Sequence, residues 1–214
     1  FNPLLEARSD IELEQVAEIL VKAGSGGNAK DAFWDAGASR LVSVLLKLLR
    51  RAGQDDPANF TLGNLYSLLQ AFGSDGAPLD DFVIKWAYDP SNPTDQTLWE
   101  EWKGAITGNQ TAVQGFALTA LTALRAFTNQ NLVKLTSASS FELADIRREK
   151  TVLYFVIPAQ HAEYYGFWTS VFFRSVFNMC MRQMPRAGEL PIYILYDEFG
   201  HSTLPSFVSV ANTI

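Results

Sequence analysis

Leu41-Val-Ser-Val-Leu-Leu-Lys-Leu-Leu49 is the strongest helical stretch in the sequence. With Trp34, its leucines at positions 41, 45 and 48 fall along one stripe of a helix, and Leu46 and Leu49 widen that stripe. Asp31 comes shortly before and can cap the helix at its N-terminus. The pattern therefore predicts a long amphipathic helix that begins after Asp31.

The same helical spacing extends on both sides of this stretch, through residues 9–136. Ser9 and Glu12 form a capping-box pattern ahead of a first helix, and the glycine-rich run 24–27 is expected to end it. Further helices are predicted at 62–72 after Thr61, 79–88, 94–107 after Thr94, and 110–128 after Asn109, separated by segments rich in Gly, Pro, Asp and Asn. Residues 9–136 are therefore predicted to form an all-α domain with short loops.

Residues 137–214 follow a different pattern. Thr151–Ile157 is a continuous run of β-branched and aromatic residues, 163–183 is a long apolar helical segment, and 191–196 is a second apolar run. Continuous apolar runs are typical of strands buried on both faces. The order strand, helix, strand predicts a βαβ unit with a parallel sheet, and hence an α/β fold for this part of the chain.

Two adjacent carboxylates, Asp197 and Glu198, end the second apolar run, Ile192-Tyr-Ile-Leu-Tyr-Asp-Glu198. In open α/β sheets, ligands bind beyond the carboxyl ends of the strands. In P-loop ATPases an Asp in this position holds Mg²⁺ through water, and a following Glu accepts a proton from the water that attacks the γ-phosphate of ATP. The same pattern also suits two acids that cap a following turn.

No phosphate-binding G-x-x-x-x-G-K-[ST] motif occurs in the 214 residues. The glycines at 24–27 follow a helix rather than a strand and lack the Lys-Ser/Thr, so we interpret them as a linker. The chain by itself is therefore expected not to hydrolyse ATP.

Charge disfavours a surface that binds DNA. The formal net charge is −6 and the pI is about 4.9, and residues 9–136 hold fifteen acidic against ten basic side chains. Nucleic acids are bound mainly through Lys and Arg, whereas an acidic face suits a basic protein partner or simply solubility. The single Cys180 can form neither an internal disulfide nor a metal cluster, which is typical of a cytosolic protein.

Several residues that could be assigned a function have plainer interpretations. The most apolar segment, 164–181, is interrupted by Arg174 and Asn178, so no membrane span is expected. His161 has no apparent partner and is predicted to lie in a surface loop. Arg147 and Arg148 are predicted to lie in the last turn of a helix, where basic side chains suit its negative end. The tryptophans at 86, 99 and 102 are expected to fill cores rather than stack on bases, because Lys and Arg are not interleaved with them. His201 is assigned no role.

The chain resembles the TraG/TraD-type coupling proteins of conjugation and type IV secretion. The likeness runs through most of the sequence, and its parts are Phe1-Asn-Pro-Leu4, Phe33-Trp34, Leu41 to Leu49, Leu135-Thr-Ser137, Phe141 to Ile146, Val152 to Pro158, Asp197-Glu198-Phe199, Leu204-Pro205 and Phe207.

This resemblance implies an internal fragment of a RecA-like P-loop NTPase with a large inserted all-α domain. Residues 1–8 would be an edge of the nucleotide-binding domain, 9–136 the all-α domain, and 137–214 the part with the Walker B strand. Asp197 would be the Walker B residue that holds Mg²⁺ through water, and Glu198 the catalytic carboxylate. The P-loop and a membrane anchor would lie upstream of Phe1, and an arginine finger beyond Ile214.

The resemblance also implies what the parent protein does. It would be a hexameric ATPase at the cytoplasmic face of the bacterial inner membrane that uses ATP and Mg²⁺ to drive single-stranded DNA or protein into a type IV secretion channel. Its all-α domain would recognise the relaxosome or secreted cargo, and no cofactor is expected on the fragment alone. Two alternatives remain open, a non-catalytic helical adaptor and a different hexameric DNA-translocating ATPase.

Overall fold

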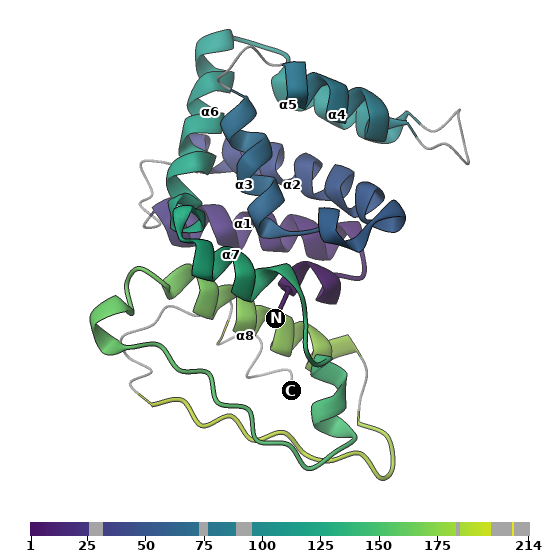
Figure 1. The fold of residues 1–214 in the computed structure, drawn as a ribbon, viewed down its shortest axis with the longest axis vertical. Coiled ribbons are helices and arrows are strands. Elements are labelled where there is room, and N and C mark those ends of the chain that lie inside the picture. The colour runs from purple at the N-terminus through teal and green to yellow at the C-terminus, as the bar shows by residue number, and fades with distance from the viewer. Residues whose placement is uncertain (26–31, 73–76, 89–95, 183–184, 198–206, 208–214) are drawn as a thin grey trace.

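The computed structural model describes residues 1–25, 32–72, 77–88, 96–182, 185–197 and Phe207, and the elements in these ranges are helices (Figure 1). The α-helices are α1 Asp10–Ser25, α2 Ala32–Asp55, α3 Leu62–Ala71, α4 Ala77–Ala87, α5 Thr97–Ile106, α6 Gln110–Ala123, α7 Gln130–Ser137 and α8 Gly166–Arg182. Short 3-10 helices are η1 Pro3–Glu6, η3 Pro57–Asn59, η4 Arg125–Thr128, η5 Leu143–Arg147 and η6 Ala159–His161.

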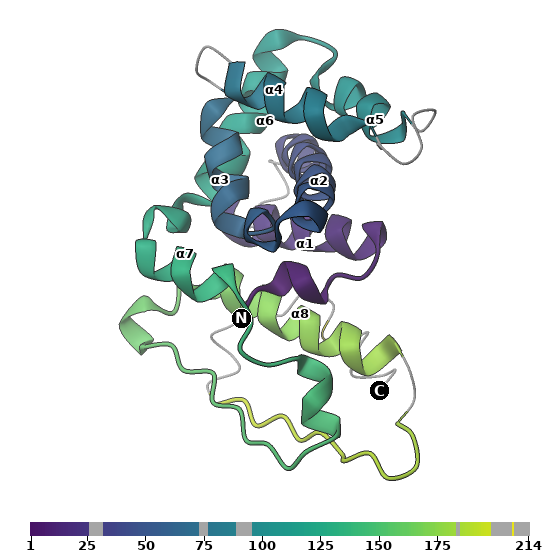
Figure 2. The ribbon, with the colours of Figure 1, turned by 45° about the vertical axis from the view of Figure 1, so that its right-hand side comes forward.

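Helix α2 forms the centre of the helical body, which we define as α1 to α7 in residues 10–137. Every side chain from Leu41 to Leu49 is buried, so this part of α2 lies in the interior of the helical body. Helices α1, α3, α4, α5 and α6 pack around it, and Figure 2 shows α2 nearly end-on between α1, α3 and α5. The long helix predicted from residues 41–49 is confirmed, and it is more deeply buried than one amphipathic stripe would require.

Side-chain caps fix several helix starts where the sequence predicted them. The backbone N–H of Glu12 donates to Ser9 Oγ (3.3 Å), and that of Asn64 donates to Thr61 Oγ1 (3.1 Å). Asn109 Oδ1 accepts from the N–H of Thr111 at 2.9 Å. Each cap satisfies a backbone donor that the first helical turn leaves without an intrahelical partner. Asp31 and Thr94, predicted as caps of two other helices, lie outside the described residues.

The predicted helix 110–128 is divided. α6 ends at Ala123, η4 follows, and Asn129 caps the separate helix α7 by accepting from the N–H of Asn131 (3.0 Å). Asn favours such caps because its short side chain reaches its own backbone two residues on. The first helix ends where predicted, because α1 ends at Ser25, within the glycine-rich run 24–27.

The N-terminal Asn-Pro-Leu segment is an anchor point. Asn2 is fully buried, its Oδ1 accepts from the N–H of Leu4 (3.0 Å), and its Nδ2 donates to the carbonyl of Phe60 (2.8 Å). The N–H of Asn2 donates to Ser139 Oγ (3.0 Å). In the sequence Ser139 and Glu142 form a second capping-box pattern, which predicts a short helix near Arg148. In the structure Ser139 binds Asn2 instead, and η5 begins at Leu143 after Glu142, which provides no side-chain cap.

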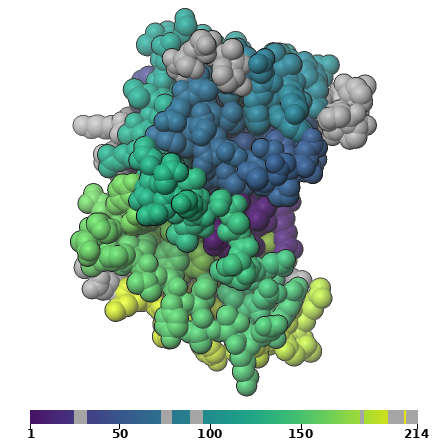
Figure 3. Space-filling model, in the orientation of Figure 1, coloured from purple at the N-terminus to yellow at the C-terminus, as the bar shows by residue number. Residues whose placement is uncertain are grey.

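Below the helical body, the residues that follow it form a second region around α8, which we call the α8 lobe (described residues of 138–197 and Phe207). In Figures 1 and 3 it lies beneath α1 and α7. Aromatic rings fill it: Phe172 lies 5.5 Å from Phe1 and 4.6 Å from Phe155 between ring centroids, and Phe173 lies 5.1 Å from Tyr196. The buried face of α8 therefore holds the chain segments on either side of it.

The predicted RecA-like parallel sheet is not present, and this α/β expectation was wrong for the described residues, which form an all-helical fragment. Segments 151–157 and 191–196 are extended and lie side by side under α8 (Figures 1 and 2), yet neither is a strand. Near them, one backbone hydrogen bond joins Leu190 N–H to the Arg147 carbonyl (2.8 Å).

The reason lies in what surrounds these segments. α8 covers one face, whereas on the other face Tyr154 is 83% and Leu195 is 98% exposed. A parallel sheet is stable where both faces are covered and its strands form a hydrogen-bonded ladder. The two segments are apolar, as the sequence shows, but the described residues do not cover their second face.

Candidate functional site

Asp197, the predicted magnesium residue, lies at the end of the second extended segment and is exposed. The segment is fixed just before it, because Tyr196 packs on Phe173 of α8. Glu198, the predicted catalytic residue, lies outside the described residues. The proposed roles of both residues stay predictions.

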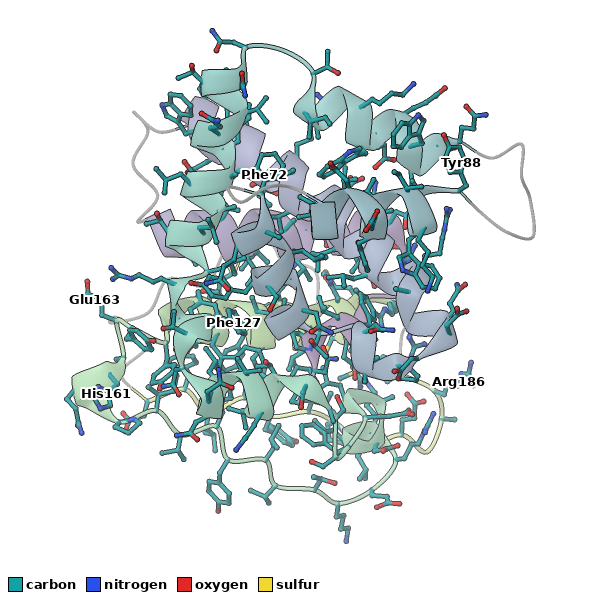
Figure 4. All side chains as sticks on the ribbon, turned by 45° about the horizontal axis from the view of Figure 1, so that its top comes forward. Phe72, Tyr88, Phe127, His161, Glu163 and Arg186 are labelled. Atoms are coloured by element: carbon teal, nitrogen blue, oxygen red, sulfur yellow. The ribbon has the colours of Figure 1, made fainter. Side chains whose placement is uncertain are left out.

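In the described parts of the chain, no three His, Cys, Asp or Glu side chains gather closely enough to hold a metal ion. His161 is exposed at the outer edge of the molecule, next to Glu163, whereas Phe127 lies in its interior (Figure 4). Trp86 and Trp102 are 8% and 4% exposed, which confirms that these two fill the core. No helix within the described ranges has the combined length and apolarity to cross a bilayer.

A cleft of about 780 Å³ opens in the helical body, with α2 as its floor and α1 and α5 as its walls. Small side chains at positions 32, 36, 39 and 43 of α2 (Ala, Ala, Ser, Ser) line the floor, and this i, i+4, i+7, i+11 spacing places them along one face. Glu14, Glu18 and Lys22 come from α1 and Glu101 from α5. The rest of the α2 lining is Asp35, Arg40, Val44 and Lys47.

Lys47 joins the three helices at the base of the cleft. Its Nζ donates to Glu14 Oε1 and to Glu101 Oε2, both at 2.8 Å, and its side chain is 6% exposed. Burial by itself would lower the pKa of Lys47, but the hydrogen bonds and charges of Glu101 and Glu14 outweigh burial and raise it. Lys47 therefore remains protonated, and its positive charge is shared between two carboxylates.

A second ion pair joins the helical body to the α8 lobe. Arg182 donates from Nε to Glu12 Oε1 (3.1 Å) and from Nη2 to Glu12 Oε2 (2.7 Å), and Nη2 also donates to the carbonyl of Glu6. Burial would raise the pKa of Glu12, but hydrogen bonds from Arg182 and from the N–H of Arg8 lower it overall. The bidentate geometry orients α8 against the start of α1.

Sequence reasoning missed both ion pairs. One signal for the first was visible, because Lys47 interrupts a leucine run that predicts burial, and a buried lysine needs an anionic partner. Glu12 was explained as part of a capping box. In the structure its side chain does accept from a backbone N–H, that of Arg8 rather than Ser9, and it also binds Arg182. A single sequence does not reveal that second, long-range partner.

The described residues therefore form a helical body with a polar cleft, joined to a lobe around α8. Comparison with protein families gives the membership of the chain. Residues 1–207 match the family described as type IV secretory system conjugative DNA transfer, and the chain belongs to this family. Comparison with curated proteins and with solved structures gave no match.

Proposed function

We propose that this chain is part of a coupling ATPase that delivers DNA or protein to a type IV secretion channel. The observation that carries the proposal is the family match over residues 1–207, which includes the segment ending in Asp197 and Glu198. A protein of conjugative DNA transfer has to move a charged polymer across membranes. Such transport requires a source of free energy, and ATP hydrolysis at a site with Mg²⁺ and an Asp-Glu pair would supply it.

In this proposal the two carboxylates have different roles. Asp197 holds Mg²⁺ through water, and Glu198 accepts a proton from the attacking water. A phosphate-binding loop must come from another part of the complete protein, since the motif is missing from this sequence. ATP and Mg²⁺ would then bind to the assembled hexamer at the cytoplasmic face of the inner membrane. The packing of Tyr196 on Phe173 supports the proposal because it anchors the residue next to Asp197.

The helical body is proposed to recognise the relaxosome or the secreted cargo. Its fifteen acidic and ten basic side chains over residues 9–136 favour protein over DNA as the direct ligand. The cleft between α1 and α5 gives such a partner a polar site with charged walls.

The proposal is tested by Glu198→Gln in the complete protein. Glutamine keeps the size of the side chain but cannot act as the base, so nucleotide binding should persist while ATP turnover falls at least about 100-fold. Binding of a fluorescent ATP analogue and release of phosphate measure the two effects separately.

Glu163→Gln is the matched control, because Glu163 is exposed in the α8 lobe far from the acidic pair in sequence, and its change should leave turnover intact. Turnover that survives Glu198→Gln would remove the assigned catalytic role. Complete protein that neither binds nor hydrolyses ATP would favour a helical adaptor instead.

A further inference from the structure

We propose that the cleft between α1 and α5 is a docking groove for a short extended segment of a partner protein that carries lysine or arginine side chains. This inference rests on the proposed recognition role of the helical body, and it adds the location of the site and the chemistry of its ligand.

The shape of the cleft suits a peptide. Its volume of about 780 Å³ lies within the range of roughly 300–1,000 Å³ found for sites that enclose small ligands. The floor is a row of two alanines and two serines, which leave room for a bound backbone, and the serine hydroxyls can pair with its amide groups. Arg40 is exposed beside the same floor and can donate to a peptide carbonyl.

Four carboxylates line the cleft, from Glu14, Glu18, Asp35 and Glu101, against three cations, from Lys22, Arg40 and Lys47, so the excess charge is negative and suits a cation. Glu14 and Glu18 stand on the α1 wall with side chains 55% and 53% exposed, so their carboxylates are accessible to an incoming ligand. Glu14 shares the single ammonium of Lys47 with Glu101, which leaves this group of three with one net negative charge. A lysine or arginine of the partner would complete that neutralisation.

The second carboxylate of the α1 wall can also be released for binding. Glu18 is paired with Lys22 four residues later, and both side chains are more than half exposed. Exposed pairs of this kind contribute between zero and about 1 kcal/mol, so a partner cation can replace Lys22 at low cost. Two carboxylates one helical turn apart then define two adjacent positions for basic side chains.

The same arrangement disfavours phosphate groups. The ammonium of Lys47 is 6% exposed and already bound to two carboxylates, and the two exposed cations of the lining, Lys22 and Arg40, stand among four carboxylates. Carboxylates on both walls would repel a phosphate, and the net charge of −6 adds to that repulsion. A nucleic-acid backbone is therefore a poorer ligand for this cleft than a basic peptide.

The test measures binding of a fluorescent peptide of alternating arginine and serine to the 214-residue chain by anisotropy. Changing Glu14→Gln and Glu18→Gln together should weaken binding at least about tenfold. Asp80→Asn with Asp81→Asn removes the same charge from exposed positions on α4, away from the cleft, and should change binding less than about twofold. Melting temperatures confirm that each variant is folded.

A second variant removes space without changing charge. Ala36 is exposed on the cleft floor, and Ala36→Trp should also weaken the peptide at least about tenfold by filling the groove. The inference is overturned if the wild-type chain does not bind the arginine-serine peptide, or if it binds a glutamate-serine peptide as tightly. It is also overturned if the Glu14/Glu18 and Asp80/Asp81 double variants weaken peptide binding equally, or if Ala36→Trp does not change it. These outcomes do not involve ATP turnover, so they are separate from the test of Glu198.

Discussion

Lys47 of α2 donates a hydrogen bond of 2.8 Å to Glu101 of α5 from a side chain that is 6% exposed. Burial of an unpaired ammonium is strongly unfavourable, so the Lys47 ammonium depends on its carboxylate partners. The second bond, to Glu14, completes the connection from α1 through α2 to α5. This cluster therefore contributes to the packing of the helical body as well as forming the base of its cleft.

Lys47→Met should lower the free energy of unfolding by about 1–3 kcal/mol, because it removes the ammonium that two carboxylates share. The loss is at the low end for a buried pair, since Glu14 and Glu101 are 55% and 34% exposed and can be hydrated instead. Urea denaturation at neutral pH measures it. Lys22→Met, in an exposed pair, is the control and should stay within about 0.5 kcal/mol. If the two substitutions lowered the free energy of unfolding equally, the Lys47 cluster would stabilise the chain no more than an exposed ion pair does.

The Glu12–Arg182 pair should make stability depend on acid. Because the pKa of Glu12 is lower in the folded chain than its ordinary value of 4.5, its contribution is fully present above that value and is lost as the pH falls through the folded pKa. Glu12→Gln should therefore lower the melting temperature most at neutral pH, and the gap to wild type should narrow toward pH 3. A gap that stays constant with pH would assign the effect of the substitution to packing or capping.

Gly24→Ala should destabilise the chain by about 1–3 kcal/mol through overpacking. A Cβ at this position would lie 2.4 Å from the Cα of Ala123 on α6, and a backbone atom cannot move away cheaply. Gly166→Ala on α8 is the matched control, because its Cβ would meet nothing within 4 Å, and it should stabilise by about 0.4–1 kcal/mol through lower entropy of the unfolded chain. Chemical denaturation measures the free energy of unfolding of both variants. If Gly166→Ala lowered it as much as Gly24→Ala, the close approach of Gly24 to Ala123 would not explain the loss.

The helical body could be predicted in large part from the sequence because its signals are local. Thr61 and Asn109 cap the helices that their positions indicated, and the leucine run 41–49 specified the central helix. The break between α6 and α7 was missed because residues 124–128 carry neither Gly nor Pro. The glycine-rich run 24–27 does end α1, but the close approach of Gly24 to Ala123 was not visible in the sequence, because it depends on long-range packing.

The structure of the α8 lobe could not be predicted from local sequence signals. An apolar run specifies that residues seek burial, but not whether the covering layer belongs to the same segment of chain. Val152 and Tyr193 are 75% and 83% exposed despite their composition. The polar contacts of the cleft were likewise hidden, because Lys47 is 33 residues from Glu14 and 54 from Glu101 in sequence.

The two faces of segment 151–157 provide a last test, in two neighbouring residues. Phe155 stacks on Phe172 with ring centroids 4.6 Å apart, whereas Tyr154 is 83% exposed. Phe155→Ala should therefore lower the free energy of unfolding by about 2–4 kcal/mol, since it empties part of the aromatic cluster, and Tyr154→Ala should change it by less than about 0.5 kcal/mol. Denaturation of the 214-residue chain measures both. If the two losses were equal, Tyr154 would have to be covered in solution, and the one-sided packing of this segment on α8 would be wrong.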